Sequence, residues 1–182
     1  MWNAVNYFET LNGKLKTTKD AYHFCRVSGI NGLEDVLANY MTKNAFLAVD
    51  DSDDGMTIRL GGGYFNRRSI VIYVLKKYKI TDMSERETVL SETRTIRNSL
   101  ISKLLVDANR NTEGLNYLNK ERIPYHEVPG YFAAGTTGIY FIITIDEPVN
   151  LAYNDNEWTT RQTKVLGCVG KNDEYYLGRQ NR

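Results

Sequence analysis

The spacing closest to that of a metal site lies in the acidic turn at residues 50–55. Its oxygen-bearing side chains alternate and a glycine takes the sixth position, as in the first half of a calcium-binding loop. These residues are Asp50, Ser52, Asp54 and Gly55. Such a loop also needs a bidentate glutamate at its twelfth position, which is Gly61 here, and two flanking helices, where the pattern predicts strands. The segment therefore favours a solvated turn, and the sequence predicts no metal or other cofactor.

The two histidines offer little for catalysis. His23 and His126 are far apart in the sequence, and Glu127 is the one potential ligand beside either of them. A zinc site needs three or four ligands. A serine hydrolase would show a G-x-S-x-G turn, which this sequence lacks. We therefore expect both histidines to be packing or surface residues, no catalytic residues, and no enzyme.

Three consecutive glycines, residues 61–63, could allow a backbone to approach a phosphate. A phosphate-binding loop leads directly into a helix, and a P-loop adds a lysine followed by serine or threonine. The residues that follow here are aromatic and basic and lead into a strand. A turn is the better interpretation.

A basic segment suggests a second class of function. Residues 67–79 hold five cations and no acidic residue, namely Arg67, Arg68, Lys76, Lys77 and Lys79. Aromatic residues are interleaved with them or come just before them, namely Tyr64, Phe65, Tyr73 and Tyr78. Basic and aromatic side chains on a sheet can bind single-stranded nucleic acid. A small nucleic-acid-binding module is therefore the alternative hypothesis, although the segment is short and the chain is almost neutral.

Composition excludes several other classes. The chain has 182 residues and a net charge of +1, so it has no overall field that would attract nucleic acid or an anionic membrane. No segment reaches the ~20 apolar residues of a membrane-spanning helix, and the amino terminus lacks the pattern of a signal peptide. Cys25 and Cys168 have no close partners in the sequence and are expected to be free thiols. These features predict a cytoplasmic protein.

The elements that would position any site begin with residues 69–75. Every residue after Ser69 in this run is apolar, which predicts a central strand covered on both faces. A long amphipathic helix of about 24 residues follows, with Ser84 and Glu87 as an expected capping box. Its apolar stripe is Val89, Leu90, Thr93, Ile96, Leu100, Ile101, Leu104 and Ala108.

The remaining pattern predicts helices first and strands afterwards. The expected helices are 2–15, 20–27 and one opening at Asn31, with Leu33, Val36, Leu37, Tyr40 and Met41 on the buried side of the last. The expected strands are 45–49, 56–60, the central run, an edge strand at 123–128 and a second unbroken apolar strand at 139–145. The first three of these strands, joined by short connections, are expected to form a β-meander.

This order predicts an α+β fold with a mostly antiparallel sheet, made of the meander and one or two later strands and packed by the long helix and the amino-terminal helices. Residues 1–148 are expected to form a single domain. Residues 149–182 are more polar and are expected to form a hairpin or an arm.

Two unbroken apolar strands require cover on both faces of the sheet. If the helices all pack on one face, the other must be covered by the tail or by another copy of the chain, and such contacts usually build closed symmetric assemblies. Aromatic residues on loops and strand ends more often mark contact surfaces than reaction centres. The interface candidates are Tyr64, Phe65, Tyr131 and Phe132.

The order of elements resembles a known family. The strand at 68–74, the helix at 85–105 and the strand at 138–145 resemble those of the tail-terminator or tail-completion (minor tail) proteins of long-tailed bacteriophages and prophages. The resemblance covers residues 1–148 and carries no individual site residues. It implies a non-enzymatic virion protein that forms a homo-oligomeric ring, usually a hexamer, at the end of the tail tube. Its partners would be itself and other tail or connector proteins, without a membrane.

Overall fold

The computed structural model describes all residues except 1, 53, 113, 130–134 and 159–182. The chain divides into two units, Met1–Asn150 and Leu151–Arg182. The division falls two residues after the boundary expected from the sequence. In the second unit, the described residues 151–158 hold one short 3-10 helix, η3 (Asp155–Glu157), and the rest of the expected hairpin or arm lies outside the described residues.

The first unit is an α+β fold, as predicted. Its helices are α1 (Ala4–Lys14), α2 (Gly29–Asn39), α3 (Met83–Asn109) and the short η1 (Leu115–Tyr117). Its strands are β1 (His23–Val27), β2 (Ala45–Asp50), β3 (Asp54–Leu60), β4 (Gly63–Lys77), β5 (Tyr125–Val128) and β6 (Thr136–Val149). They form one six-stranded sheet in the order β1-β2-β4-β6-β5, with β3 also paired to β4. Every described pair is antiparallel except β1 with β2.

The two apolar runs form the centre of this sheet, as expected. β4 has 15 residues, and its residues from Tyr64 to Lys77 pair with the whole of β6, which has 14 residues. Alternate side chains of β4 enter two separate cores, because successive residues of a strand point to opposite faces. Ile70, Ile72 and Val74 join one core, whereas Tyr73 and Leu75 join the other.

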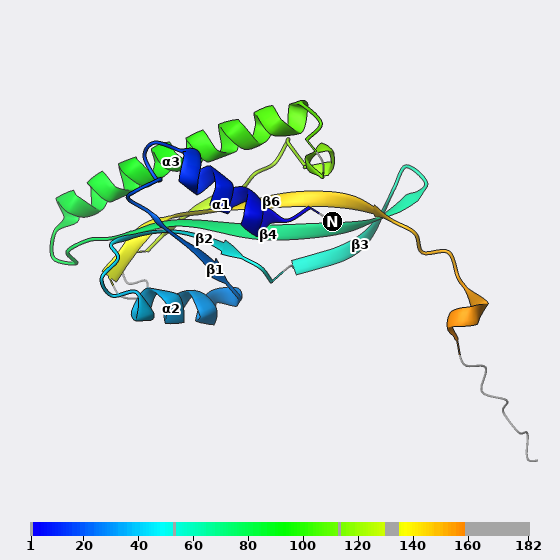
Figure 1. Cartoon of the computed structure of the whole chain (residues 1–182), viewed down its shortest axis with the longest axis horizontal. Coiled ribbons are helices and arrows are strands. Elements are labelled where there is room, and N and C mark those ends of the chain that lie inside the picture. The colour runs from blue at the N-terminus through cyan, green and yellow to red at the C-terminus, as the bar shows by residue number, and fades with distance from the viewer. Residues whose placement is uncertain (1, 53, 113, 130–134, 159–182) are drawn as a thin grey trace, which may run out of the picture. The chain divides into compact units, whose positions relative to one another are not determined.

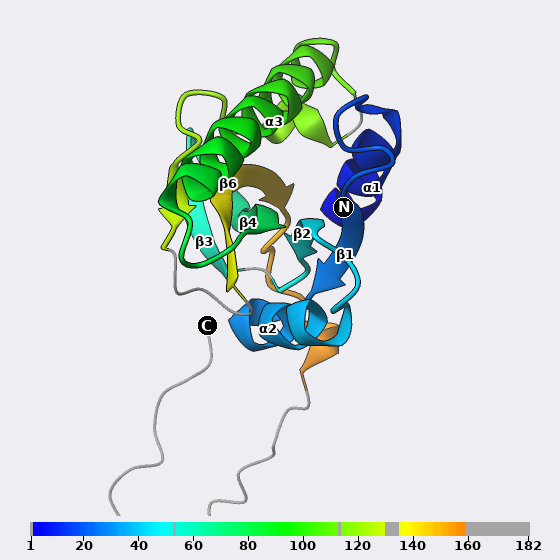
Figure 2. The ribbon, with the colours of Figure 1, turned by 90° about the vertical axis from the view of Figure 1, so that its left-hand side faces the viewer.

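Helices cover the two faces of the sheet unequally. α1 and α3 pack on one face, which we call the first face, and α2 packs on the other, the second face (Figures 1 and 2). The helices therefore do not all pack on one face, and α2 supplies part of the cover that the sequence left open. In the view of Figure 1, the end of the sheet formed by β3, β4 and β6 extends past α2.

The expected helix at 20–27 is wrong, because His23–Val27 forms strand β1. The segment is too short to bury a helical face of its own. As a strand, it buries Cys25 and Val27 and pairs in parallel with β2. Helix α2 makes the crossover between these two parallel strands, which is the usual connection in a parallel pair.

The expected meander is also wrong. β2 pairs with the carboxyl half of β4, from Ala45 opposite Lys76 to Val49 opposite Ile72. β3 pairs with the amino half of the same β4 edge, starting at Asp54 opposite Ser69. The acidic turn thus separates two strands that lie end to end along β4, and it does not join two strands that pair with each other.

Two details of the helices differ from expectation. Helix α3 is capped by Asp82, whose carboxylate accepts hydrogen bonds from the amides of Ser84 and Glu85, both at 3.0 Å, so Ser84 lies inside the helix. Helix α2 begins at Gly29, before Asn31. Among the expected buried residues of α2, Leu33 and Leu37 are fully buried and Val36 packs partly, but Tyr40 and Met41 are exposed because the helix ends at Asn39.

The apolar stripe of α3 is confirmed. All its expected residues are buried except Ile101, which is half-buried against the same core. The edge position of β5 is confirmed as well. Within the described ranges, no helix has the length and apolar character needed to cross a membrane.

Candidate functional site

The second face of the sheet carries a group of apolar side chains that none of the described helices covers. They come from β3, β4 and β6, at the end of the sheet away from α2 (Figure 1). Residues directly opposite each other in an antiparallel pair share a face, so the register places these side chains together. We call this group the open patch; it consists of Met56, Ile58, Leu60, Phe65 and Pro148, together with the charged residues Asp54, Arg67 and Asp146.

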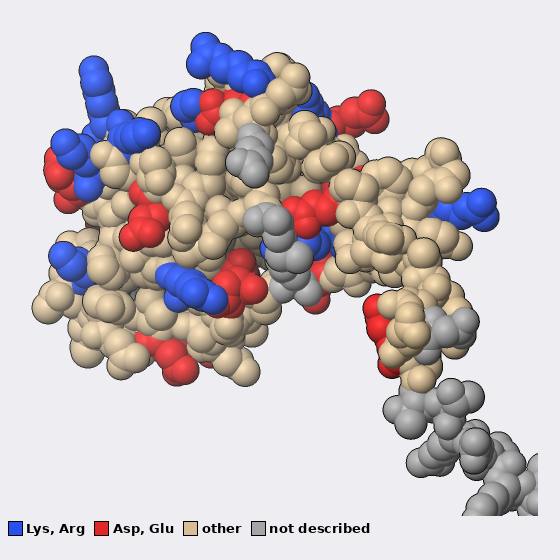
Figure 3. All heavy atoms as spheres, turned by 45° about the vertical axis from the view of Figure 1, so that its right-hand side comes forward, with Lys and Arg blue, Asp and Glu red and all other residues tan. Residues whose placement is uncertain are grey.

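The open patch leaves large apolar side chains in contact with water. Met56 is 61% exposed and Leu60 is 45% exposed. Ile58, Phe65 and Pro148 form a continuous apolar row across the three strands, because Ile58 and Pro148 both lie opposite Phe65. Figure 3 shows few charged side chains on the side of this projecting end that is in view. Contiguous apolar patches of this kind on a protein surface mark interaction sites.

An ion pair borders the apolar part of the patch, and the polar row of Asp54, Ser69 and Thr144 lies next to it on the same face. Arg67 lies opposite Asp146 in the β4–β6 ladder. Its guanidinium donates two hydrogen bonds to the carboxylate, from Nε to Oδ1 at 2.7 Å and from Nη2 to Oδ2 at 2.8 Å. This bidentate contact raises the pKa of Arg67 above its ordinary value, mainly through the hydrogen bonds. The patch thus contains this ion pair and a second acidic side chain, Asp54.

The opposite face of the same strands is polar. Thr57 donates a hydrogen bond to Asn66 there, and the guanidinium of Arg59 lies 6.0 Å from the ring centre of Tyr64. At this end of the sheet, the first face thus carries polar side chains that can face water in an isolated chain. The apolar second face is the one that no described helix covers at this end.

The expected interface residues do not all lie together. Phe65 belongs to the open patch, whereas its neighbour Tyr64 lies on the first face and is 46% exposed. Tyr131 and Phe132 lie outside the described residues. The structure therefore places one of the four interface candidates, Phe65, in the open patch.

The basic segment is divided between the two faces. Arg67 and Lys77 lie on the second face, where Lys77 donates to the carbonyl of Met41 at 3.0 Å. Arg68 and Lys76 lie on the first face, where Lys76 pairs with Glu92 at 2.6 Å and Arg68 lies 3.7 Å from Glu147. The fifth residue, Lys79, follows the strand in an exposed position. The structure therefore does not gather these five cations on one surface.

The acidic turn is tied to the start of helix α2. The Oδ1 atom of the buried Asp50 accepts hydrogen bonds from the amide of Gly29 at 3.0 Å and from the amide and hydroxyl of Ser52. Asp51 contacts Ser28 and Arg26, which hold the pKa of its carboxyl below the ordinary value. Among the described residues, no three His, Cys, Asp or Glu side chains come together as a metal-binding group.

The two histidines lie at opposite edges of the sheet. His23 belongs to β1 and packs against Tyr40, with ring centres 4.4 Å apart. His126 belongs to β5 and stacks on Tyr140 at 5.1 Å. Strands β2, β4 and β6 lie between these edges, so the two imidazoles cannot act on one substrate.

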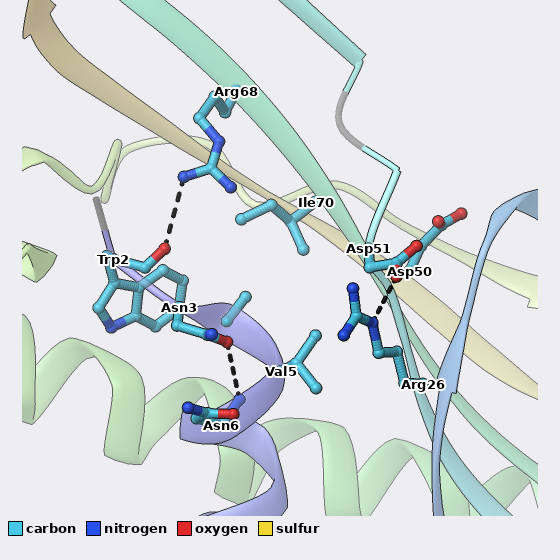
Figure 4. Close-up of a pocket in the computed structure, with 10 residues that line it drawn as sticks. Trp2, Asn3, Val5, Asn6, Arg26, Asp50, Asp51, Arg68 and Ile70 are labelled. Atoms are coloured by element: carbon cyan, nitrogen blue, oxygen red, sulfur yellow. Dashed lines mark hydrogen bonds and ion pairs between the residues drawn. The ribbon is translucent and has the colours of Figure 1, made fainter.

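A hollow of about 230 Å³ lies where the start of α1 meets the sheet (Figure 4). Two arginines line it, Arg26 from β1 and Arg68 from β4, and each contacts an acceptor of the chain. Arg26 pairs with Asp51, and Arg68 donates to the carbonyl of Trp2 at 3.4 Å. These contacts fasten the amino-terminal segment and the end of β2 to the sheet, which identifies the hollow as a structural junction.

Sequence reasoning missed most of the open patch, although its signal was present. Met56, Ile58 and Leu60 alternate with polar residues, which is the pattern of a strand with one apolar face. Without the register, nothing in that pattern says whether a helix of the same chain covers the apolar face.

Comparisons with known proteins add no relative. No family model matches the sequence, and no curated protein matches it. The resemblance to tail-terminator proteins therefore stays a prediction.

Proposed function

We propose that this chain is a non-enzymatic, self-assembling structural protein whose copies contact one another through the open patch. The observation that carries the proposal is the row formed by Ile58, Phe65 and Pro148, which no helix among the described residues of Met1–Asn150 covers. Burying a large apolar side chain fully contributes roughly 1.5–3 kcal/mol. Several such side chains on one surface can offset the entropy that two molecules lose on association.

The distribution of polar groups supports an assembly contact over a reaction centre. Two of the ionisable groups of the open patch, Arg67 and Asp146, are paired with each other. The patch follows the pleated surface of three strands, as a surface for a large partner would. Apolar centres with a small number of matched charges are typical of subunit interfaces.

The resemblance to tail-terminator proteins gives this proposal a specific form. In that form, copies of the chain are made in the cytoplasm and assemble into a ring, possibly a hexamer, at the end of a phage or prophage tail. Other tail or connector proteins would be its further partners. The nucleic-acid-binding alternative has less support, because the five cations of residues 67–79 are divided between two faces and the loop after them.

The test is the mass of the full chain in solution, measured by light scattering over a range of concentrations in low and in high salt. One chain has a mass of 20.9 kDa. We expect masses that are multiples of this value and that persist at about 1 M salt, because salt screens charge contacts but does not weaken apolar ones. A mass of one chain at every concentration would overturn the proposal. Binding to single-stranded nucleic acid that falls steeply with salt would favour the alternative.

A further inference from the structure

We infer that residues 151–158 of one copy, which we call the aromatic segment, dock into a hollow between helices α1 and α3 of the next copy. This inference rests on the proposed function and adds a second contact to it. The two surfaces differ, so the contact is head-to-tail. Repeated head-to-tail contacts build a ring when the rotation between copies closes.

The hollow between α1 and α3 is mostly apolar. It has a volume of about 200 Å³ and lies between the end of α1 and the middle of α3. Small-molecule pockets usually have roughly 300–1,000 Å³, so this hollow suits one large side chain better than a separate ligand. Three leucines, one serine and one lysine from each helix line it, namely Leu11, Lys14, Leu15, Ser99, Leu100 and Lys103.

The charge around the hollow favours an acidic partner. Lys14 is exposed and has no acidic partner among the described residues. Lys103 pairs with Asp107, but 48% of the Lys103 side chain stays exposed. Residues 4–20 hold three lysines and two acidic residues, and residues 91–109 hold three basic and two acidic residues. Both segments that form the hollow are therefore positively charged overall.

The aromatic segment has the chemistry that such a hollow would bind. Its three large side chains are mostly in water, with Leu151 53%, Tyr153 71% and Trp158 64% exposed. The rings of Tyr153 and Trp158 stack with their centres 5.9 Å apart, which makes one aromatic projection. Residues 151–158 contain two acidic residues and no basic residue. The segment is thus apolar and acidic, whereas the hollow is apolar and basic.

Trp158 is the side chain that enters the hollow. Tryptophan and tyrosine are enriched among the residues that supply most of the binding energy of interfaces. A buried indole N–H needs an acceptor, and Ser99 offers one. The Ser99 hydroxyl donates to the carbonyl of Thr95 at 3.2 Å, so its oxygen can still accept. The exposed Glu157, next to Trp158 in the chain, would then pair with Lys14.

A contact made by one aromatic side chain is small, so it acts beside the open patch and does not replace it. Copies that lack the open-patch contact should therefore not assemble through the hollow alone. The hollow adds a direction to the assembly, because it joins two different surfaces of successive copies.

Cross-linking through introduced cysteines tests the contact directly. One chain carries Lys14→Cys and a second, tagged chain carries Glu157→Cys, both with Cys168→Ser so that the remaining native thiol is the buried Cys25. With a short bismaleimide we expect a covalent pair of the two chains. Lys43→Cys in place of Lys14→Cys is the matched control, because Lys43 is an exposed lysine away from the hollow, and it should give no cross-link above background.

A chain with both cysteines separates contacts between copies from contacts within one chain. Contacts between copies give a ladder of covalent products at multiples of 20.9 kDa, whereas a contact within one chain leaves single chains.

Exchange of charges gives a second measurement, by sedimentation of labelled chains. Lys14→Glu and Glu157→Lys should each associate with itself about tenfold more weakly than the wild type, because each places like charges together. A 1:1 mixture should restore association, since every contact in an alternating arrangement joins opposite charges. Lys43→Glu is the control and should associate as the wild type does.

The aromatic anchor is tested in the same way. Trp158→Ala should associate at least about tenfold more weakly, and Trp158→Phe within about threefold of the wild type. Circular dichroism confirms that each variant is folded. Wild-type association of Trp158→Ala, or cross-links confined to single chains, would overturn the docking. If the chains still self-associate in that case, the proposed function stands and only this inference fails. A wild type that stays a single chain would remove both.

Discussion

Gly138 of β6 lies so close to the backbone of Val74 in β4 that there is no room for a side chain. A Cβ atom at position 138 would lie 2.1 Å from the carbonyl oxygen of Val74. The φ angle of Gly138 is +150°, a value that residues with a side chain rarely adopt. The pairing of the two central strands therefore depends on glycine at this position.

We predict that Gly138→Ala lowers the free energy of unfolding by about 3 kcal/mol, because the contact is with backbone, which cannot move aside without disturbing the ladder. Urea unfolding followed by circular dichroism measures the change. Gly13→Ala is the control, since a Cβ at Gly13 in helix α1 meets nothing within 4 Å and should stabilise the helix by up to about 1 kcal/mol. Equal effects of the two substitutions would contradict the close approach of β4 and β6.

The start of α3 gives a second prediction. Asp82→Ala should cost about 1 kcal/mol, because the amides of Ser84 and Glu85 lose their acceptor. Ser84→Ala should change stability by less than about 0.5 kcal/mol, because this hydroxyl does not cap the helix. The two variants are compared by thermal unfolding. The reverse order of effects would restore the capping box expected from the sequence.

A third prediction concerns stability in alkali. Burial raises the pKa of both Tyr7 and Tyr22 well above the ordinary value, and their contacts with Asp107 and Glu92 raise it further. Above about pH 10 the unfolded chain loses these protons while the folded chain keeps them. Below about pH 10 these two tyrosines make a constant contribution to the free energy of unfolding. As the pH rises further, the free energy of unfolding should fall.

The Tyr22→Phe variant separates this effect from other alkaline changes. Its free energy of unfolding should be lower near neutral pH by about 1 kcal/mol, because the hydrogen bond to Glu92 at 2.9 Å is lost. Above pH 10 its stability should fall less steeply than that of the wild type. Denaturant unfolding at several pH values measures both slopes, and parallel curves would show that Tyr22 titrates normally in the folded chain.

The central strands and α3 could be predicted from the sequence because each carries a long and unambiguous pattern. Ile70 to Leu75 is apolar throughout, and the stripe from Val89 to Ala108 keeps the helical period over many turns. Segments of this length bury enough surface to determine their own structure.

The structure of the short segments depends instead on the strands with which they pair. Residues 23–27 allow either a helix or a strand by pattern, and pairing of β1 with β2 selects the strand. The pairing of β2 and β3 with the same edge of β4 depends on contacts between residues far apart in the sequence. The open patch follows from this register, so neither its members nor the absence of a covering helix could be read from the local pattern.

The most direct test of assembly through the open patch compares two neighbouring residues of β4 by light scattering. Phe65 lies in the patch and Tyr64 lies on the opposite face. We predict that Phe65→Asp reduces the solution mass to that of one chain, 20.9 kDa, because a charge enters the apolar contact, whereas Tyr64→Asp keeps the mass of the wild-type assembly. Assembly of Phe65→Asp to the wild-type mass, with both variants folded, would contradict the account.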